Sequence, residues 1–190
     1  MVQEQSSSAL YPQLLEDAWL ELDKGVRRLH INTDGENVQA VGTFRVQHGK
    51  GWLARLLVLP MPPASEAVTT RLTVTRRGRG ELWSRMFGRR PLVSTQTAGP
   101  DRLLIERMGF LELRFRLEAS NGALHYKCTH AALCVGPLRI SLPRWLSPQI
   151  SGHEESGNSP QGTLVSVSVT APFAGFLLSY EGNMEAERPR

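Results

Sequence analysis

The sequence predicts a mainly β domain of the α+β class, built as a strongly bent antiparallel sheet or a closed barrel of about eight to ten strands. Two observations predict it. After residue 66, apolar and polar residues alternate with period two, as they do in half-buried strands. Short turns separate these stretches, and strands joined by short turns pair antiparallel. So many strands in one sheet curl or close, because an open edge invites aggregation.

The first third of the chain predicts helices around one strand. Apolar residues recur at three- or four-residue spacing over 10–29, which indicates an amphipathic helix whose last turns Gly25 weakens. A strand is expected over 39–47. Residues 52–59 are expected to form a two-turn helix that ends at a proline-rich stretch. We expect one or two N-terminal helices to pack on the barrel or to plug it.

Further strands complete the expected sheet. The most regular alternation spans 111–117, and Asn121-Gly122 after it is a strong hairpin signal. After residue 66, the expected strands are 68–76, 81–87, 92–97, 102–107, 111–117, 124–135, 139–142, 163–170 and 176–181. A START-like helix-grip fold is the lower-ranked alternative, because it normally ends in a long helix and 163–181 has the pattern of strands.

Length and composition favour one globular domain. The 190 residues suit a single domain over 10–182, with a mobile loop at 147–162 and disordered tails at 1–9 and 183–190. The apolar share of 41% is too high for a disordered chain, and a net charge of +4 is too small for a polycation that binds nucleic acid. No stretch of about 20 apolar residues is present, so we expect a cytoplasmic protein without a transmembrane segment.

Several short patterns occur together in a fixed order. They are Tyr11-Pro12, Val26–His30, Gly49–Arg55, Trp83–Gly88, Glu106–Gly109, Leu142–Pro148, Pro172–Gly175 and Tyr180–Gly182. This set resembles the uncharacterised bacterial family called domain of unknown function 4166, over about residues 10–182. Lys24-Gly25 departs from the Leu-Pro-like step expected there. Similar domains follow nicotinamide-dependent dehydrogenase-like domains in longer chains, so the resemblance implies an accessory role beside redox or lipid metabolism. It implies no established activity and no catalytic residues.

The strand expected over 81–87 carries the main candidate site. One face of that strand presents Glu81, Trp83, Arg85 and Phe87. An aromatic ring between two charged groups can form a polar patch in a cavity, where Arg85 would bind a carboxylate or phosphate. The alternative is a cross-strand ion pair with the Trp ring stacked on an exterior face.

Glu106 and Arg107 extend this candidate ligand-binding set. They are adjacent, so they face opposite sides of a strand and only one of them points inward. A buried charge costs several kcal/mol unless it is paired. The inward one therefore needs a partner such as Arg85 or Glu81.

The remaining reactive residue types predict no catalytic residue, no metal and no cofactor. The five histidines form no compact ligand set, and His30 is expected to cap a helix or to contact the core. Cys128 and Cys134 would lie ~20 Å apart on one straight strand, which favours free thiols.

Two surface features stay open at this stage. The basic runs 76–79 and 89–90 are either solvated turns or a rim for phosphates. Trp145 between two prolines either contacts a membrane at a loop tip or plugs one end of the barrel.

The sequence therefore favours a non-catalytic binding domain for an apolar or amphipathic, lipid-like small molecule. The alternative is a filled-core interaction or accessory domain for an NAD(P)-dependent oxidoreductase-like partner. An enzyme that uses Glu81 or Glu106 as acid or base ranks below both. No nucleic-acid partner is expected, and peripheral membrane contact is compatible with the sequence.

Overall fold

Ten antiparallel strands form a closed barrel in the computed structural model, which describes residues 9–32, 37–157, 159 and 161–187. Around the barrel the order is β6-β5-β4-β3-β2-β1-β11-β10-β9-β7, and pairing of β7 with β6 closes it. The strands are β1 (Val38–His48), β2 (Ser65–Arg77), β3 (Gly80–Phe87), β4 (Arg90–Ala98), β5 (Leu104–Met108), β6 (Leu111–Ser120), β7 (Ala123–Val135), β9 (Gln149–Ser156), β10 (Gly162–Ala171) and β11 (Gly175–Ala186). The predicted antiparallel barrel is confirmed.

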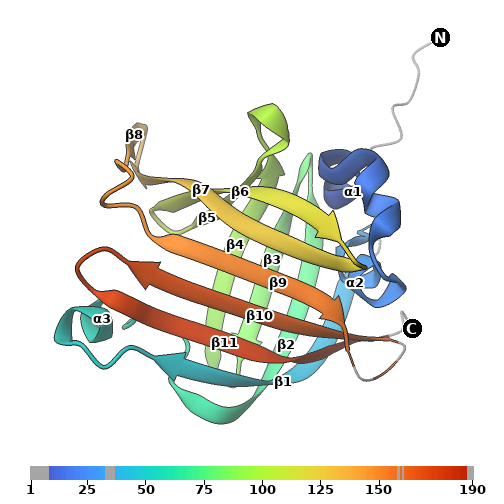
Figure 1. Ribbon diagram of the computed structural model, residues 1–190, viewed down its shortest axis with the longest axis horizontal. Coiled ribbons are helices and arrows are strands. Elements are labelled where there is room, and N and C mark those ends of the chain that lie inside the picture. The colour runs from blue at the N-terminus through green and yellow to red at the C-terminus, as the bar shows by residue number, and fades with distance from the viewer. Residues whose placement is uncertain (1–8, 33–36, 158, 160, 188–190) are drawn as a thin grey trace.

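Short helices lie at the two ends of the barrel (Figure 1). One end, the plug end, carries α1 (Leu10–Leu15), the 3-10 helix η1 (Glu16–Glu21) and α2 (Lys24–His30). The other end, the α3 end, carries α3 (Trp52–Leu57) and the short strand β8 (Leu138–Ser141), which pairs with the last residues of β7. A 3-10 turn, η2 (Pro100–Arg102), links β4 to β5 at the plug end.

The N-terminal helix is divided where the chain meets the barrel wall. A single helix was expected over 10–29 with Gly25 as its weak point. The α-helix ends first at Glu16, whose φ is positive, and continues as a 3-10 turn. The second break lies at Leu22, which forms a bridge with Gly122, and the Asp23 N–H donates to the Gly122 carbonyl over 2.9 Å. Asn121 and Gly122 both have positive φ, as the predicted Asn-Gly hairpin turn requires. The second break therefore depends on a long-range contact that local spacing does not reveal.

Two predicted unstructured segments are strands. The prediction of a mobile loop over 147–162 is wrong for most of that range, because Gln149–Ser156 forms β9 between β7 and β10. The tail expected over 183–190 was wrong at its start, because β11 extends to Ala186 and pairs with β1 there. Its last three residues, and residues 1–8 of the other expected tail, lie outside the described residues. Polar composition indicated loops, but closing the barrel requires these strands.

Inward-facing side chains form the main core. Phe44, Phe87 and Tyr180 meet in edge-to-face and tilted contacts, with ring centroids 5.4–6.1 Å apart. A smaller cluster at the α3 end packs Ala54 and Val58 against β11. No helix of the described residues is long and apolar enough to cross a membrane.

A charged cluster outside the barrel fastens β8 to the wall. Glu112 on β6 points outward but is only 1% exposed, because arginines cover it. Its carboxylate accepts hydrogen bonds from Arg107 over 2.6 Å, from Arg139 on β8 over 2.9 Å and from Arg114 over 3.3 Å. Burial raises the pKa of Glu112, but the hydrogen bonds from Arg107 and Arg139 outweigh burial and lower that pKa to about 2.

This shift predicts a defined loss of stability in acid. A lowered folded-state pKa adds stability that is complete above the ordinary pKa of 4.5 and is lost as the pH falls towards 2. We expect Glu112→Gln to lower the free energy of unfolding by on the order of 2 kcal/mol at pH 6 and by much less at pH 2.5. Urea unfolding at both pH values measures this difference. Glu118→Gln, on the exposed outer face of the same strand, is the control, and equal effects of the two variants would contradict the assignment.

Candidate ligand-binding site in the barrel lumen

The candidate residues of β3 all face the barrel interior. Glu81, Trp83 and Phe87 are at most 4% exposed, and Arg85 between them is half-buried. The prediction that the four share one face is confirmed, and that face is the interior one. The Arg85 guanidinium carbon lies 5.0 Å from the centroid of the Trp83 ring, which is cation–π geometry.

Arg85 pairs with Glu106 across the interior. Its Nη1 and Nη2 lie 3.4 and 3.3 Å from one oxygen, Oε1, of Glu106. Ser94 on β4 accepts from Arg85 Nη1 over 3.0 Å and donates to the same Glu106 oxygen over 2.5 Å. Glu106 is thus the inward member of its pair, and Arg85 is the partner that the cost of burying a charge required.

Arg107 does not join this group. It points outward from β5 and binds Glu112 on the outer surface, so the structure brings together five of the six predicted residues. The strand alternation that turns Glu106 inward turns Arg107 away.

Glu81 and Trp83 form a second buried pair. The indole Nε1 donates to Glu81 Oε2 over 2.9 Å, whereas Glu81 Oε1 has no hydrogen-bond partner among the described residues. Burial raises the pKa of Glu81, and the hydrogen bond from Trp83 and the positive field of Arg76 offset this only in part. Glu81 is therefore easier to protonate than an ordinary carboxylate.

A further polar network joins the N-terminal helices to the barrel wall. His30 Nε2, at the end of α2, lies 2.6 Å from Glu154 Oε2 on β9. Tyr126 on β7 donates to the other Glu154 oxygen over 3.0 Å, and Tyr11 on α1 donates to Gln96 on β4 over 2.9 Å. These contacts fix two helices of the plug end against three strands.

The electrostatics of this network keep Glu154 ionised and the tyrosines protonated. Burial raises the pKa of Glu154, but His30 and the hydrogen bond from Tyr126 outweigh burial and lower it. Burial and the nearby Glu154 raise the pKa values of Tyr11 and Tyr126 well above 10.0. The His30 side chain is 0% exposed and that of Glu154 is 10% exposed, so the His30 ring at the centre of this network is closed to solvent. We call the network of His30, Glu154, Tyr126, Tyr11 and Gln96 the latch.

The Arg85 pair, in contrast, is accessible from within the barrel. The side chain of Arg85 is 16% exposed and that of Glu106 is 12% exposed. Both point inward, so their exposed surface faces the lumen, which therefore contains space for solvent. Further inward-facing residues of the same region are only half-buried, among them Cys128, Ile150, Val165, Val167 and Tyr180.

Comparison with known protein families assigns the chain. Residues 22–184 match the family model described as domain of unknown function (DUF4166). The chain belongs to the DUF4166 family. No curated protein and no solved structure gives a significant match. The family has no assigned activity, so the chemistry of this DUF4166 domain has to be inferred from its own residues.

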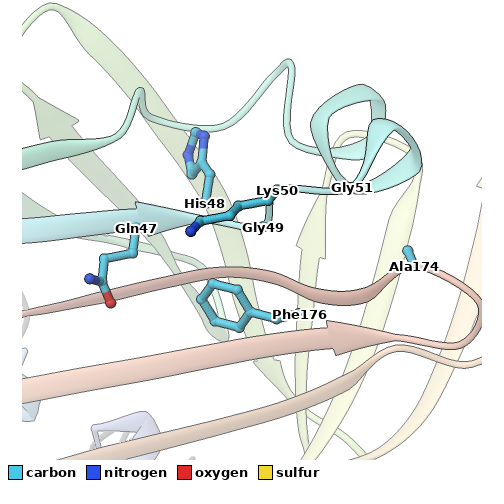
Figure 2. A pocket seen from close by; sticks show the side chains of 7 residues that line it. All are labelled: Gln47, His48, Gly49, Lys50, Gly51, Ala174 and Phe176. Carbon is cyan, nitrogen blue, oxygen red and sulfur yellow. The ribbon is translucent and has the colours of Figure 1, made fainter.

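Two grooves mark the surface of the DUF4166 domain. One, of about 430 Å³, lies where β1 ends, and Figure 2 shows Gln47, His48, Lys50 and Phe176 lining it. The other, of about 690 Å³, lies along β7, β9, β10 and β11 and is lined by five serines, two histidines and the charged residues Glu118, Lys127 and Glu181. Neither groove is lined by Arg85 or Glu106, the ion pair of the barrel interior.

Neither a metal site nor a disulfide marks the DUF4166 domain in its described part. No group of three or more His, Cys, Asp or Glu residues is arranged there to hold a metal ion. Cys128 and Cys134 are free, as the sequence predicts. Burial raises the pKa of Cys128 to about 11, although hydrogen bonds with the His130 and Arg114 backbone oppose this. The Cys128 thiol is therefore a poor nucleophile at neutral pH.

Sequence reasoning missed the latch. It expected His30 to cap a helix or to contact the core, and the second alternative is correct. It placed Glu154 in a loop, and it gave no role to Tyr11 or Tyr126. His30 lies 124 positions from Glu154 in the sequence, and Tyr126 lies 28 positions from it. No local spacing could therefore pair these residues.

The latch predicts a large effect of one histidine on stability. We expect His30→Ala to lower the free energy of unfolding by about 2–4 kcal/mol, because it leaves Glu154 buried without its closest partner. Urea unfolding at pH 7 measures this loss. His130→Ala on the exposed outer face of β7 is the matched control, with an expected change within about 0.5 kcal/mol. If both variants behaved alike, His30 would not hold the plug.

Proposed function

We propose that this protein is a non-catalytic binding domain for an amphipathic, lipid-like small molecule with an anionic head group. The head lies against Arg85 and Tyr180 in the lumen, and the apolar part extends towards the α3 end. The single observation that carries the proposal is an inward-facing, solvent-accessible arginine inside a closed β-barrel.

Arg85 suits an anionic head because its hydrogen bonding is incomplete. A guanidinium has five N–H donors in a planar fork that matches a carboxylate or phosphate. Among the described residues, only Ser94 and Glu106 accept hydrogen bonds from it, and the distances to Glu106 exceed 3.2 Å. Donors therefore remain for a second anion, which adds the charge-assisted bonds that Glu106 alone does not supply.

Tyr180 provides a second contact from a different strand of the barrel wall. It lies on β11 and faces the lumen, where burial raises its pKa to about 12 although the charge of Arg85 opposes the rise. Its hydroxyl is therefore protonated and able to donate to an anion. A cation and a neutral donor from two strands of the wall resemble the few polar groups that orient a ligand in an otherwise apolar pocket.

The lumen wall beyond Arg85 is apolar. Around the lumen, the inward-facing apolar side chains include Phe87, Leu92, Cys128, Ile150, Val165 and Val167. Burying one methylene group against such a wall is worth about 0.8 kcal/mol. An alkyl or isoprenoid chain of several carbons would therefore supply most of the binding free energy, and the arginine would fix its direction.

The proposal excludes a catalytic role for the latch. His30 and Glu154 could in principle exchange a proton, but His30 has no exposed side-chain surface and both groups hold the plug helices. A general acid or base has to reach its substrate within hydrogen-bond distance. The accessible groups, Arg85 and Glu106, neutralise one another instead.

Titration with a dansyl-labelled fatty acid tests the proposal. We expect saturable binding to the full chain, and a loss of about tenfold or more in affinity in Arg85→Met, which keeps the apolar stem and removes the charge. Arg71→Met is the matched control, because Arg71 is exposed on the outer face of the neighbouring strand β2. A dansyl-labelled alkane without the carboxylate should bind both variants and the wild type equally.

Two results would contradict the proposal. The first is an absence of saturable binding to a wild-type chain that circular dichroism shows to be folded, which would favour the filled-core accessory domain instead. The second is equal weakening by Arg71→Met and Arg85→Met, which would place the fatty acid outside the barrel.

A further inference from the structure

Exposed apolar side chains gather at the α3 end of the barrel. In the described part of the chain, the only large exposed apolar residues that lie away from this end are Leu20, Ile31, Val93 and Leu164. The exposed large apolar residues of this end are Trp52, Leu56, Leu57, Leu59, Phe110, Val135, Leu138, Ile140, Trp145, Leu146, Phe173 and Phe176. A soluble domain rarely exposes so many together, and such a patch marks an interaction surface. We call this end, formed by residues 49–64, 88–89, 109–110, 136–148 and 172–174, the mouth face.

The packing of α3 explains why its aromatic residue points outward. The helix buries Ala54 and Val58 against Leu177 and Leu178 of β11. The opposite side of the same helix therefore carries Trp52, which is 79% exposed, out into solvent.

A second aromatic group projects beside it from two other connections. Phe173, in the turn between β10 and β11, is 82% exposed, and Trp145, between β8 and β9, is 66% exposed. Their ring centroids lie 6.5 Å apart in an edge-to-face contact. Figure 1 shows α3, β8 and these connections at the same side of the molecule. Three separate loops thus present apolar groups in one direction.

The charge of the mouth face is entirely of one sign. Its five connections contain no Asp or Glu residue. They contain five basic residues that are all exposed. Arg139 is paired with Glu112, so the unopposed charge of the described residues here comes from Lys50, Arg55, Arg89 and Arg144. The plug end differs, because its helices expose Glu16, Asp17, Glu21 and Asp23. The groove in Figure 2 belongs to the mouth face and sets Lys50 near the half-exposed ring of Phe176.

We propose that the mouth face docks on the surface of an anionic lipid bilayer. Trp side chains are enriched at the boundary between head groups and acyl chains, where one end of the ring is wet and the other apolar. Each Lys or Arg near an anionic bilayer contributes about 1 kcal/mol of attraction, which high salt screens. A face that combines exposed Trp and Phe with unopposed cations is complementary to this surface. A protein partner could bind an apolar patch that has no excess of cations. The excess of cations therefore favours the bilayer over a protein partner.

Docking in this orientation would also serve the proposed lumen site. If the lumen takes up a lipid-like molecule as proposed above, docking by the mouth face would bring the α3 end of the barrel to the bilayer that supplies it. The docking itself stands on the exposed residues alone and does not require that the lumen binds anything.

Co-sedimentation of the full chain with vesicles tests the docking. We expect binding to vesicles of phosphatidylcholine with phosphatidylglycerol, and about tenfold weaker binding to phosphatidylcholine alone or at 0.5 M salt. Trp52→Ser and Phe173→Ser should each weaken binding by about tenfold or more, because each removes a buried ring from the interface. Leu20→Ser is the control, since Leu20 is 73% exposed at the opposite end.

Bromine-labelled lipids give a second readout, because bromine quenches the fluorescence of nearby Trp residues. Of the four Trp residues, Trp19 and Trp83 are buried, and the other two lie on the mouth face. Vesicles of brominated lipid should quench the wild type, whereas Trp52→Phe combined with Trp145→Phe should bind vesicles and lose most of the quenching. Trp83 lines the lumen, so any quenching that remains in this variant reports lipid taken up into the barrel.

Three results would overturn the docking. One is an absence of vesicle binding, and another is equal weakening by Leu20→Ser and Phe173→Ser. The third is undiminished quenching in the double Trp variant, which would mean that the mouth face does not touch the bilayer and that only the buried Trp residues meet lipid. A dimer that dissociates in Phe173→Ser while no vesicle binding occurs would assign the face to a second copy of the chain, and this also contradicts the proposal.

Discussion

The width of a ten-stranded barrel is the constraint on which the rest of this structure depends. Barrels of about eight strands are just wide enough for inward side chains to fill, and the diameter grows with strand number. A barrel of ten strands is therefore expected to be wider than its own inward side chains fill. At the plug end, α1 and α2 insert Tyr11 and His30 into the excess space and bury both almost completely. Towards the α3 end no helix enters the lumen to the same depth, and the half-buried Arg85 and Glu106 face solvent there.

The interior contains two polar pairs, His30 with Glu154 and Arg85 with Glu106. They have different roles because they are buried to different degrees. His30 and Glu154 are bonded at 2.6 Å beneath the helices, so their interaction fixes the plug to the wall. Arg85 and Glu106 are held at longer distance in an accessible part of the lumen, so their interaction leaves donors free for an anion. Removing one partner of a tight buried pair is costly, whereas a looser and wetter pair can accept a third group. In the same barrel, the His30 pair therefore serves stability, and the Arg85 pair is the one proposed to bind a ligand.

Sequence patterns predicted most of the wall and about half of the interior. Alternation placed Glu81, Trp83, Arg85 and Phe87 on one face, which is a local argument. The cost of a buried charge required a partner such as Arg85 or Glu81 for whichever of Glu106 and Arg107 points inward, and the structure selects Glu106 and Arg85. Patterns failed where long-range pairing overrides local composition. Gln149–Ser156 is polar and contains Gly152, yet it is a strand because β7 and β10 offer it partners on both sides. The sequence did not predict the latch for the same reason, because His30 and Glu154 meet only after the barrel closes.

The central claim is that the lumen accepts one amphipathic molecule per chain. Native mass spectrometry of the 21.1 kDa chain, as purified and after incubation with excess hexadecanoate, tests this claim most directly. The account predicts a single adduct on each folded chain, which is lost when the chain is unfolded in acid and is less abundant in Arg85→Met under matched conditions. A bare mass in both samples, from protein that keeps its β-rich circular dichroism spectrum, would contradict it and would mean that the interior is filled.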